Sequence, residues 1–284
     1  MRKRSLFPGR RLLLAILAVL LLLPIAATLL YSFFSPDEIR HYLSTRNNFS
    51  PDTMMEIRLV PHQASLLQYY RILITDQNIL RGFLNSALYA IAIIGGQILI
   101  LPLLAYGLSC FRFRGRDSIA FCIVLLMVLP FQVTMVPNVL TLRMMNLLNT
   151  RWAIILPMFA APFSAFLLRQ YMLNIPGDLI EAAQIDSAGP FRCYTQIVFP
   201  LSLPVIGTMI ALSFAECWNL VEQPLVYLTM RADLLPLSVT FGQLTTQISG
   251  IEFAGAALFI LPSLFVYLIF QDSIMEGVQI IGIK

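Results

Sequence analysis

The sequence predicts an all-α integral membrane protein with six transmembrane helices, both termini in the cytoplasm, and a short cytoplasmic helix between the fourth and fifth spans. Of its 284 residues, 58% are hydrophobic and only 12% are charged, and the mean hydropathy is +0.79. These values lie far outside ordinary globular usage. A bilayer core of about 30 Å needs about 20 apolar residues per helix, and the apolar runs are that long, whereas barrel strands have about 10 alternating residues. The class is therefore helical.

Six apolar runs define the spans, and two longer polar segments separate them. The runs cover residues 12–34, 85–111, 119–142, 152–173, 201–219 and 254–270. Residues 35–82 form a polar outer loop, and residues 174–200 form a polar inner loop. We interpret residues 1–284 as one transmembrane domain.

Basic residues set the orientation of these spans. Five of them precede the first span: Arg2, Lys3, Arg4, Arg10 and Arg11. A cleaved signal peptide is the alternative, but this apolar core is longer than the usual roughly 7 to 15 residues and lacks a cleavage site at the expected distance. The remaining inner loops and tail hold Arg112, Arg114, Arg116, Arg169, Arg192 and Lys284, and the short outer turns hold only Arg143, Arg151 and Arg231. Both termini are therefore expected inside.

Prolines interrupt the third and fourth spans. Pro130 and Pro137 lie in the third span, and Pro157 and Pro162 lie in the fourth. Each proline removes an intrahelical hydrogen bond, so the outer half of the third span is expected to be kinked or broken. Such kinks also occur as packing features, but broken helices at membrane depth tend to line cavities, and we favour a role in a pore wall.

The inner loop contains a predicted exposed helix of about three turns. Pro176 suits its first turn, Asp178 lies near the positive end of its dipole, and Gly189 and Pro190 end it. Ile180, Ala183 and Ser187 share one face, flanked by Ala182, so a partner can approach without meeting bulky side chains. A solvated connector between two spans explains the same composition.

The order of residues in this loop resembles the EAA loop of binding-protein-dependent ABC importer permeases, in the carbohydrate group that includes the maltose permease G subunit. The residues that match are Glu181, Ala182, Ala183, Asp186, Ala188, Pro190, Phe191, Ile197 and Pro200. In that family the loop is the coupling helix, which docks in a cleft of the cytoplasmic ATPase. The resemblance implies an ATPase-coupling role for Ile180, Glu181, Ala182, Ala183, Asp186, Ser187 and Gly189. Ser187 stands where the family usually has glycine, and Phe199 stands where the family usually has leucine. Because of Ser187, the resemblance does not imply the conformation of the turn that follows the helix.

Polar residues at the outer end of the fifth span are candidates for a translocation path. Glu216, Trp218 and Asn219 lie there, with Glu222 close by, and a carboxylate in an apolar run is costly unless it faces a partner or water. The alternative is a solvated outer interface with Trp218 as a belt residue. The pattern is similar to that of the family, in which the next outer segment helps to engage the binding protein, and this favours the path.

The sequence carries no enzyme signature. It has no phosphate-binding loop or nucleophile elbow, and with two histidines and no C-x-x-C pair it predicts neither a metal site nor a cofactor. The four cysteines are interpreted as packing residues. The basic residues form no stripe, so nucleic-acid binding is not expected.

The resemblance implies a permease subunit of an ATP-driven importer in a bacterial cell membrane. It would form half of the pathway for a sugar or oligosaccharide, beside a second homologous permease, two cytoplasmic ATPase subunits and an extracellular solute-binding protein. Three alternatives stay open: an ion-coupled secondary transporter, an ABC permease for a non-sugar solute, and a membrane scaffold. The mid-span regions carry no charge and the spans do not repeat, which argues against the secondary transporter.

Overall fold

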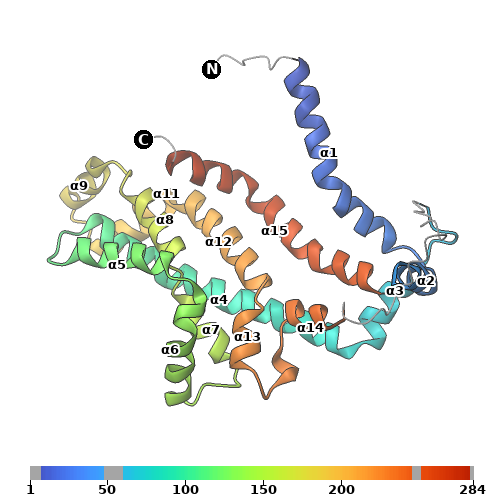
Figure 1. Ribbon diagram of the computed structural model, residues 1–284. Helices are drawn as coiled ribbons and strands as arrows, with labels where there is room; N and C mark the ends of the chain where they lie inside the picture. Colours follow the sequence, from blue (N-terminus) through green and yellow to red (C-terminus); the bar gives the residue numbers. More distant parts are fainter. Residues whose placement is uncertain (1–7, 48–59, 245–250, 282–284) are drawn as a thin grey trace. The chain divides into compact units, whose positions relative to one another are not determined.

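The computed structural model describes residues 8–47, 60–244 and 251–281 (Figure 1). All regular structure in these residues is helical, which confirms the predicted class. Four of the described helices are long and apolar enough to cross a membrane, and six spans result if each of two sharply bent helix pairs counts as one. Residues 1–7, 48–59, 245–250 and 282–284, with the parts of the predicted loops and tails that they contain, lie outside the described residues.

The chain divides into two compact units. The first unit comprises residues 1–80 and 240–261. It contains α1 (Pro8–Tyr31), α2 (Pro36–Asn47), α3 (Leu67–Tyr70) and the π-helical turn Arg71–Thr75. Helices α4 (Gln77–Cys110), α14 (Leu237–Leu244) and α15 (Glu252–Ile281) have residues in both units.

A buried glutamine joins three segments of the first unit. Gln68 is 0% exposed, and its Nε2 donates to the carbonyl oxygens of Tyr31 (2.9 Å) and Phe34 (2.8 Å). Its Oε1 accepts the backbone N–H of Ala254 at 3.3 Å. Because buried amides are costly unless paired, these bonds fix the end of α1 and the start of α15 on α3.

The second unit comprises residues 81–239 and 262–284 and holds most of the spans. In chain order its other helices are α5 (Arg116–Val128), α6 (Phe131–Met144), α7 (Trp152–Phe159), α8 (Pro162–Met172), α9 (Gly177–Ile185), α10 (Pro190–Cys193), α11 (Phe199–Leu201), α12 (Leu203–Trp218) and α13 (Glu222–Tyr227). Two buried clusters hold them together. One joins α4, α7 and α13 around Tyr89, Ile154 and Tyr227, and the other joins α4, α8 and α12 around Leu101, Leu168 and Met209.

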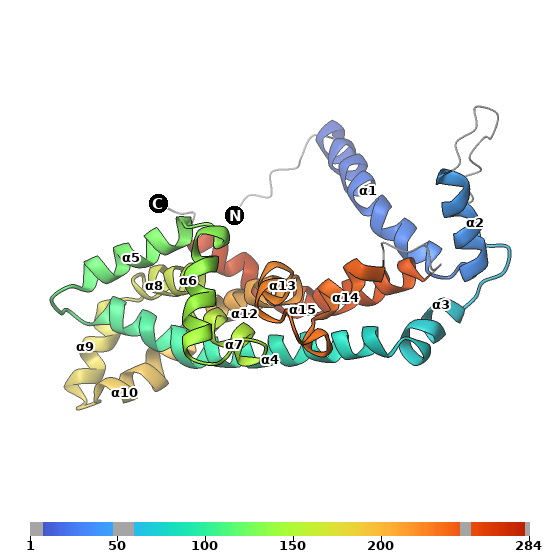
Figure 2. The ribbon, with the colours of Figure 1, turned by 60° about the horizontal axis from the view of Figure 1, so that its bottom comes forward.

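The break predicted in the third span occurs at Pro130. Helix α5 ends at Val128, α6 begins at Phe131, and the two helices differ in direction by 107° (Figures 1 and 2). Leu129 is extended, with ψ of 120°, because a residue before proline is disfavoured in the α region. Pro137 lies inside α6 without ending it.

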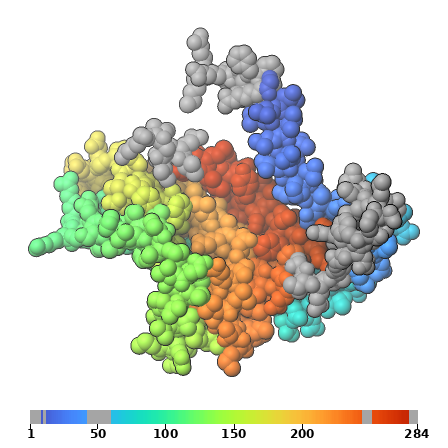
Figure 3. All heavy atoms as spheres, in the orientation of Figure 1, coloured from blue at the N-terminus to red at the C-terminus, as the bar shows by residue number. Residues whose placement is uncertain are grey.

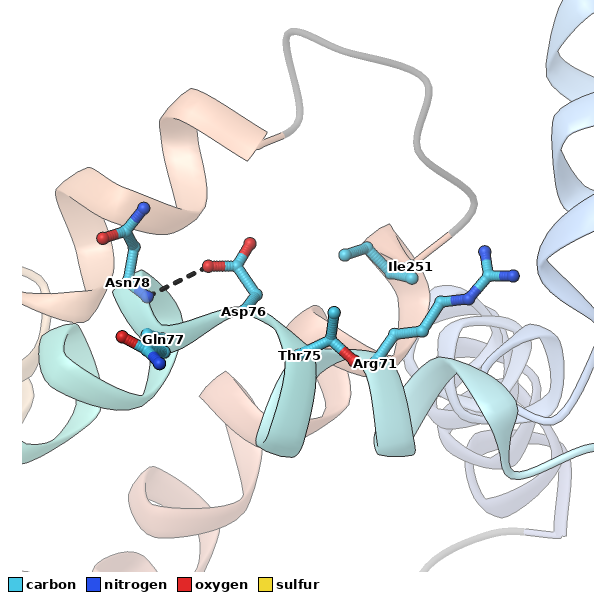
Figure 4. A pocket seen from close by; sticks show the side chains of 6 residues that line it. All are labelled: Arg71, Thr75, Asp76, Gln77, Asn78 and Ile251. Carbon is cyan, nitrogen blue, oxygen red and sulfur yellow. Dashed lines mark hydrogen bonds between the residues drawn. The ribbon is translucent and has the colours of Figure 1, made fainter.

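Two helices extend beyond the predicted spans. Helix α4 begins at Gln77 instead of Asn85, because the Asp76 carboxylate accepts the Asn78 N–H at 3.0 Å and caps the helix (Figure 4). The polar outer loop therefore ends at Asp76. Helix α15 continues to Ile281 instead of ending near Phe270. The length of an apolar run predicts only the part of a helix that lies inside the bilayer. Both helices continue past their apolar runs because no helix-breaking residue directly adjoins those runs.

The cysteines occupy different environments. Cys193 and Cys217 are buried, Cys110 is half-buried and Cys122 is exposed, and all four are free thiols. The packing interpretation therefore holds for Cys193 and Cys217 but not for Cys122, which contributes to no buried cluster.

Replacing Gly96 with alanine is expected to destabilise the second unit. A Cβ at Gly96 would overlap the ring of Phe159, whereas a Cβ at Gly95 meets nothing within 4 Å. Overpacking of this kind costs about 1–3 kcal/mol, so Gly96→Ala should lower the thermal unfolding temperature in detergent. Gly95→Ala is the matched control and should be neutral or slightly stabilising. If both variants unfold like the wild type, the contact between α4 and α7 is not close in solution.

Candidate functional site

A cavity of about 250 Å³ lies in the second unit where α5, the junction of α7 with α8, and α12 meet. Its described lining consists of Leu126, Met127, Met158, Ala160, Ala161, Pro162, Phe163, Ser164, Leu212, Ser213 and Glu216. Most of these side chains are apolar, and the polar ones come from α8 and α12. The fold thus brings the sequence-predicted Glu216 to a concave surface next to a broken helix.

The fourth span is broken at this cavity. Ala160 and Ala161 have ψ of 89° and 91°, outside the helical region, and α8 restarts at Pro162. Pro162 has no N–H, so the carbonyl of Met158, four residues earlier, loses its helical donor. Gln97 of α4 replaces that donor, because its Nε2 donates to the Met158 carbonyl oxygen at 2.7 Å and the residue is 0% exposed. A buried side chain of α4 thereby stabilises the break.

One face of α12 and its C-cap is exposed and carries a carboxylate and an amide. Leu212, Ala215, Glu216 and Asn219 are exposed and follow the spacing i, i+3, i+4, i+7 of a single helix face. Asn219 donates through Nδ2 to the Ala215 carbonyl at 2.8 Å, and it does not line the cavity. Glu216 lines it directly.

Trp218, the third residue predicted for the translocation path, is buried inside the second unit and does not line the cavity. Its side chain is 2% exposed, stacks on Phe214 with ring centroids 5.3 Å apart, and meets Phe83 edge-on at 5.6 Å. The indole ring therefore packs inside the second unit. The belt alternative is not met either, because a belt residue exposes its ring to the headgroups. Glu222 accepts two hydrogen bonds from Gln132 at 3.1 Å and lies outside the cavity.

Sequence reasoning missed the serines of the cavity. Ser213 is 2% exposed and its Oγ has no hydrogen-bond partner among the described residues, and Ser164 is 4% exposed. Single serines in apolar runs give no signal of their own. Pro162 was the available clue to the break, since the residue before a proline is disfavoured in the α region.

The segment after α12, which the sequence predicts to be on the outer side, is bound to α4. Asn85 donates to the carbonyl oxygens of Asp233 (2.9 Å) and Leu235 (3.1 Å), Tyr89 donates to that of Leu234 (2.8 Å), and Ser86 Oγ accepts the N–H of Leu237 (2.8 Å). Within the segment, the Arg231 guanidinium donates twice to Asp233 and holds the pKa of that carboxyl below its usual value. The segment is thus a fixed surface.

Helix α9 is the predicted inner helix, and it lies on the surface of the second unit (Figure 3). It begins at Gly177, one residue later than expected, because Pro176 has ψ of 126° and occupies the N-cap position. Ile180 and Ala183 are half-buried, and Ile180 packs on the cluster around Met209. Asp178, Glu181, Ala182 and Ile185 form the outward face, at i, i+3, i+4 and i+7.

The outward face of α9 carries two carboxylates and one large apolar side chain, and a second exposed apolar side chain follows in α10. Ile185 is 84% exposed, and Phe191, which follows in α10, is 73% exposed. Exposed apolar side chains of this size mark protein or membrane interaction sites when they form one contiguous patch. Sequence reasoning assigned the partner-facing role to Ile180, Ala183 and Ser187, whereas the structure directs the first two toward the chain's own core.

The turn after α9 is a Schellman motif. Ser187 has φ of 60°, the Ser187 N–H donates to the Gln184 carbonyl at 3.0 Å, and the Ala188 N–H donates to the Ala183 carbonyl at 2.9 Å. Glycine is the residue that adopts this left-handed conformation without steric cost. Ser187 therefore adopts the left-handed conformation that a glycine would adopt in this turn, and its backbone is strained as a result.

Replacing Ser187 with glycine is expected to stabilise the inner loop. A non-glycine residue in the left-handed region costs roughly 1–2 kcal/mol, so Ser187→Gly should slow proteolysis between α9 and α10, and Ser187→Val should accelerate it. Limited proteolysis of the purified protein measures both. Ser118→Gly, at an exposed helical position, is the control and should not protect the loop. Equal cleavage of Ser187→Gly and Ser187→Val would contradict the strain argument.

These features define a helical membrane permease, with a cavity at broken spans and an exposed inner helix. The chain belongs to the family described as binding-protein-dependent transport system inner membrane component, which matches residues 98–274. That range includes Met158, α9 and Glu216, and the family assignment confirms the resemblance and a location in the cell membrane.

Individual relatives are permeases named for the transport of arabinooligosaccharides or sn-glycerol-3-phosphate. The chain is 30% identical to the arabinooligosaccharides transport system permease protein AraQ of Halalkalibacterium halodurans over 205 residues, covering 71% of this chain and 73% of that protein. It is 30% identical to the sn-glycerol-3-phosphate transport system permease protein UgpE of Shigella flexneri, covering 69% and 72%. A crystal structure of a bacterial ABC transporter involved in the import of the acidic polysaccharide alginate matches with a TM-score of 0.76 at 25% identity, over 93% of this chain and 94% of that one.

Proposed function

We propose that this chain is the permease subunit of an ATP-driven ABC importer and forms half of the membrane pathway for a sugar or oligosaccharide. The observation that carries the proposal is the exposed helix α9, with its EAA-like sequence and its exposed Ile185, inside the region that matches the permease family. The relatives named for arabinooligosaccharides support a carbohydrate as the solute. ATP hydrolysis is assigned to a separate subunit.

The proposed topology has six spans and both termini in the cytoplasm. It counts each bent pair, α5 with α6 and α10 to α12, as one span. Residues 35–76 then lie outside and α9 lies inside. In this arrangement residues 1–284 act as a single transmembrane domain, although they form two compact units.

The proposed partners are a second homologous permease, two ATPase subunits and an extracellular binding protein. Asp178, Glu181, Ala182 and Ile185 would meet the ATPase, and Asp186, Ser187 and Gly189 would shape the turn that follows. Ile180 and Ala183 would transmit movement, because Ile180 packs on the core around Met209. Glu216 and Asn219, on the exposed face of α12, would face the path shared with the second permease, and the anchored segment 221–239 would face the binding protein.

Affinity purification tests this assembly. The chain is tagged at its C-terminus, extracted in mild detergent from its own organism, and the bound proteins are identified by mass spectrometry. Recovery of an ATPase and a homologous permease, together with vanadate-sensitive ATP hydrolysis, is expected. A chain that recovers neither and supports uptake driven by an ion gradient would be a secondary transporter.

Labelling of single cysteines should establish the orientation. In a background in which Cys110, Cys122, Cys193 and Cys217 are all replaced by alanine, Gln63→Cys is expected to react with a membrane-impermeant maleimide in intact cells, because residue 63 lies in the proposed outer loop. Gln184→Cys, on α9, should react only after the cells are permeabilised. Both residues are exposed, so accessibility within the protein does not limit either reaction. Labelling of Gln184→Cys in intact cells would exclude the proposed topology.

A further inference from the structure

The wall of the cavity at the broken fourth span contains a buried hydroxyl group without a hydrogen-bond partner among the described residues. Ser213 is 2% exposed, lines the cavity, and its Oγ has no hydrogen-bond partner among the described residues. Buried polar side chains are nearly always hydrogen-bonded, and each exception needs an explanation. A bound solute that enters the cavity supplies one.

Further donors converge on the same space. Helix α8 has 11 residues and begins at the cavity with Pro162, and no side chain caps this end. The N–H groups of Phe163 and Ser164 belong to the first turn, where a helix leaves its N–H groups without partners in the helix. Both residues line the cavity. One wall therefore contains backbone donors without partners in the helix, and the wall from α12 contains the buried Ser213 hydroxyl.

Glu216 supplies the acceptor. It lies one turn beyond Ser213 on α12 and is the only charged residue among the eleven described residues that line the cavity. A sugar hydroxyl both donates and accepts, so one ring can donate to the carboxylate and accept from the N–H groups of α8. The apolar remainder, including Met127, Met158 and Phe163, suits the C–H surface of a sugar ring. A volume of about 250 Å³ is that of a small ligand and not of a whole oligosaccharide.

We propose that this cavity is a subsite for one ring of a neutral sugar, and that Glu216 makes it select neutral over anionic solutes. The inference rests on the proposed function and specifies the solute class of the same pathway. A phosphate or uronate carboxylate placed beside Glu216 would be repelled in a cavity whose described lining offers no basic side chain. Ser213 and the start of α8 position the ring, and Glu216 excludes the second negative charge.

Binding to the purified complex tests the subsite apart from the binding protein, which imposes a selectivity of its own. The tagged permease is isolated with its membrane partners, freed of binding protein, and placed in lipid nanodiscs. Saturation-transfer NMR then measures binding of two neutral probes, arabinotriose and maltotriose, and two anionic probes, sn-glycerol-3-phosphate and an alginate trisaccharide. The wild type is expected to bind at least one neutral probe tenfold or more tightly than either anion.

Three variants separate the contributions. Glu216→Gln should bring the ratio of neutral to anionic affinity near unity, and Ser213→Ala should weaken the neutral probe severalfold without changing which charge class is preferred. Glu222→Gln removes a carboxylate outside the cavity and should change neither. The proposal is overturned if no neutral probe binds, if the anions bind as tightly, or if Glu216→Gln leaves the ratio unchanged. Vanadate-sensitive ATP hydrolysis by the same sample reports separately on the proposed function.

Discussion

Replacing Ile185 with aspartate is expected to release the ATPase while the permease still inserts in the membrane. Ile185 is 84% exposed and is the last residue of α9, on the face that also carries Glu181 and Ala182. If this face docks in a cleft of the ATPase, the aspartate buries an unpaired charge there. Loss of a central interface residue costs about 2 kcal/mol or more, which corresponds to roughly 30-fold weaker binding. Co-purification of the ATPase measures the effect.

Ala182→Trp tests the same face by size instead of charge. Ala182 is exposed on the free permease, so the tryptophan does not disturb the protomer, but it should overpack a close interface. Gln184→Asp is the control for Ile185→Asp, because it adds the same negative charge on the flank of α9 instead of on the outward face. If Ile185→Asp and Ala182→Trp retain the ATPase as well as Gln184→Asp does, α9 is a solvated connector and the proposed coupling role is wrong.

Glu181 is expected to affect coupling more than binding. Its carboxylate is exposed in the free chain, and an exposed ion pair contributes little, so Glu181→Ala should leave the ATPase bound unless the pair becomes desolvated in the complex. The ratio of ATP hydrolysed to solute transported, measured in proteoliposomes, shows whether hydrolysis is uncoupled.

The second large effect is expected at the break in the fourth span. Gln97→Leu removes the donor that pairs with the part-buried Met158 carbonyl. A carbonyl left without a partner costs about 1–3 kcal/mol, and loss of the buried, unpaired Gln97 Oε1 offsets part of that cost. Pro162→Ala restores a backbone N–H four residues after Met158, which allows a continuous helix. The double variant is therefore expected to recover stability but to straighten the span, close the cavity and lose transport.

Comparison of Gln97→Leu with the double variant separates the effect on stability from the effect on transport. Gln97→Leu alone should unfold at a lower temperature, and the double variant should return close to the wild-type temperature while uptake in proteoliposomes stays near background. Pro157→Ala is the control, because Pro157 lies inside α7, which continues past it. Normal uptake by the stable double variant would mean that the break is not needed for transport.

The sequence by itself determined the helical membrane class, the approximate spans, the break at Pro130 and the position of the inner helix. These features depend on local properties: the length of apolar runs, the geometry that proline imposes on its own bond, and the contrast of a polar segment with its apolar neighbours. The EAA-like order of residues 181–200 added the family. Each of these signals lies within one stretch of the chain.

Only the tertiary structure decided which side chains serve the candidate site. The orientation of α9, which buries Ile180 and exposes Ile185, depends on the cluster around Met209, to which α4, α8 and α12 contribute. Trp218 packs against Phe83, more than a hundred residues away, and Gln97 completes a hydrogen bond that Pro162 removed in another helix. Hydropathy scores treat each residue alone, whereas burial and hydrogen bonding depend on which distant helix lies alongside. The cavity at Ser213 and Glu216 exists because three such helices meet at a break.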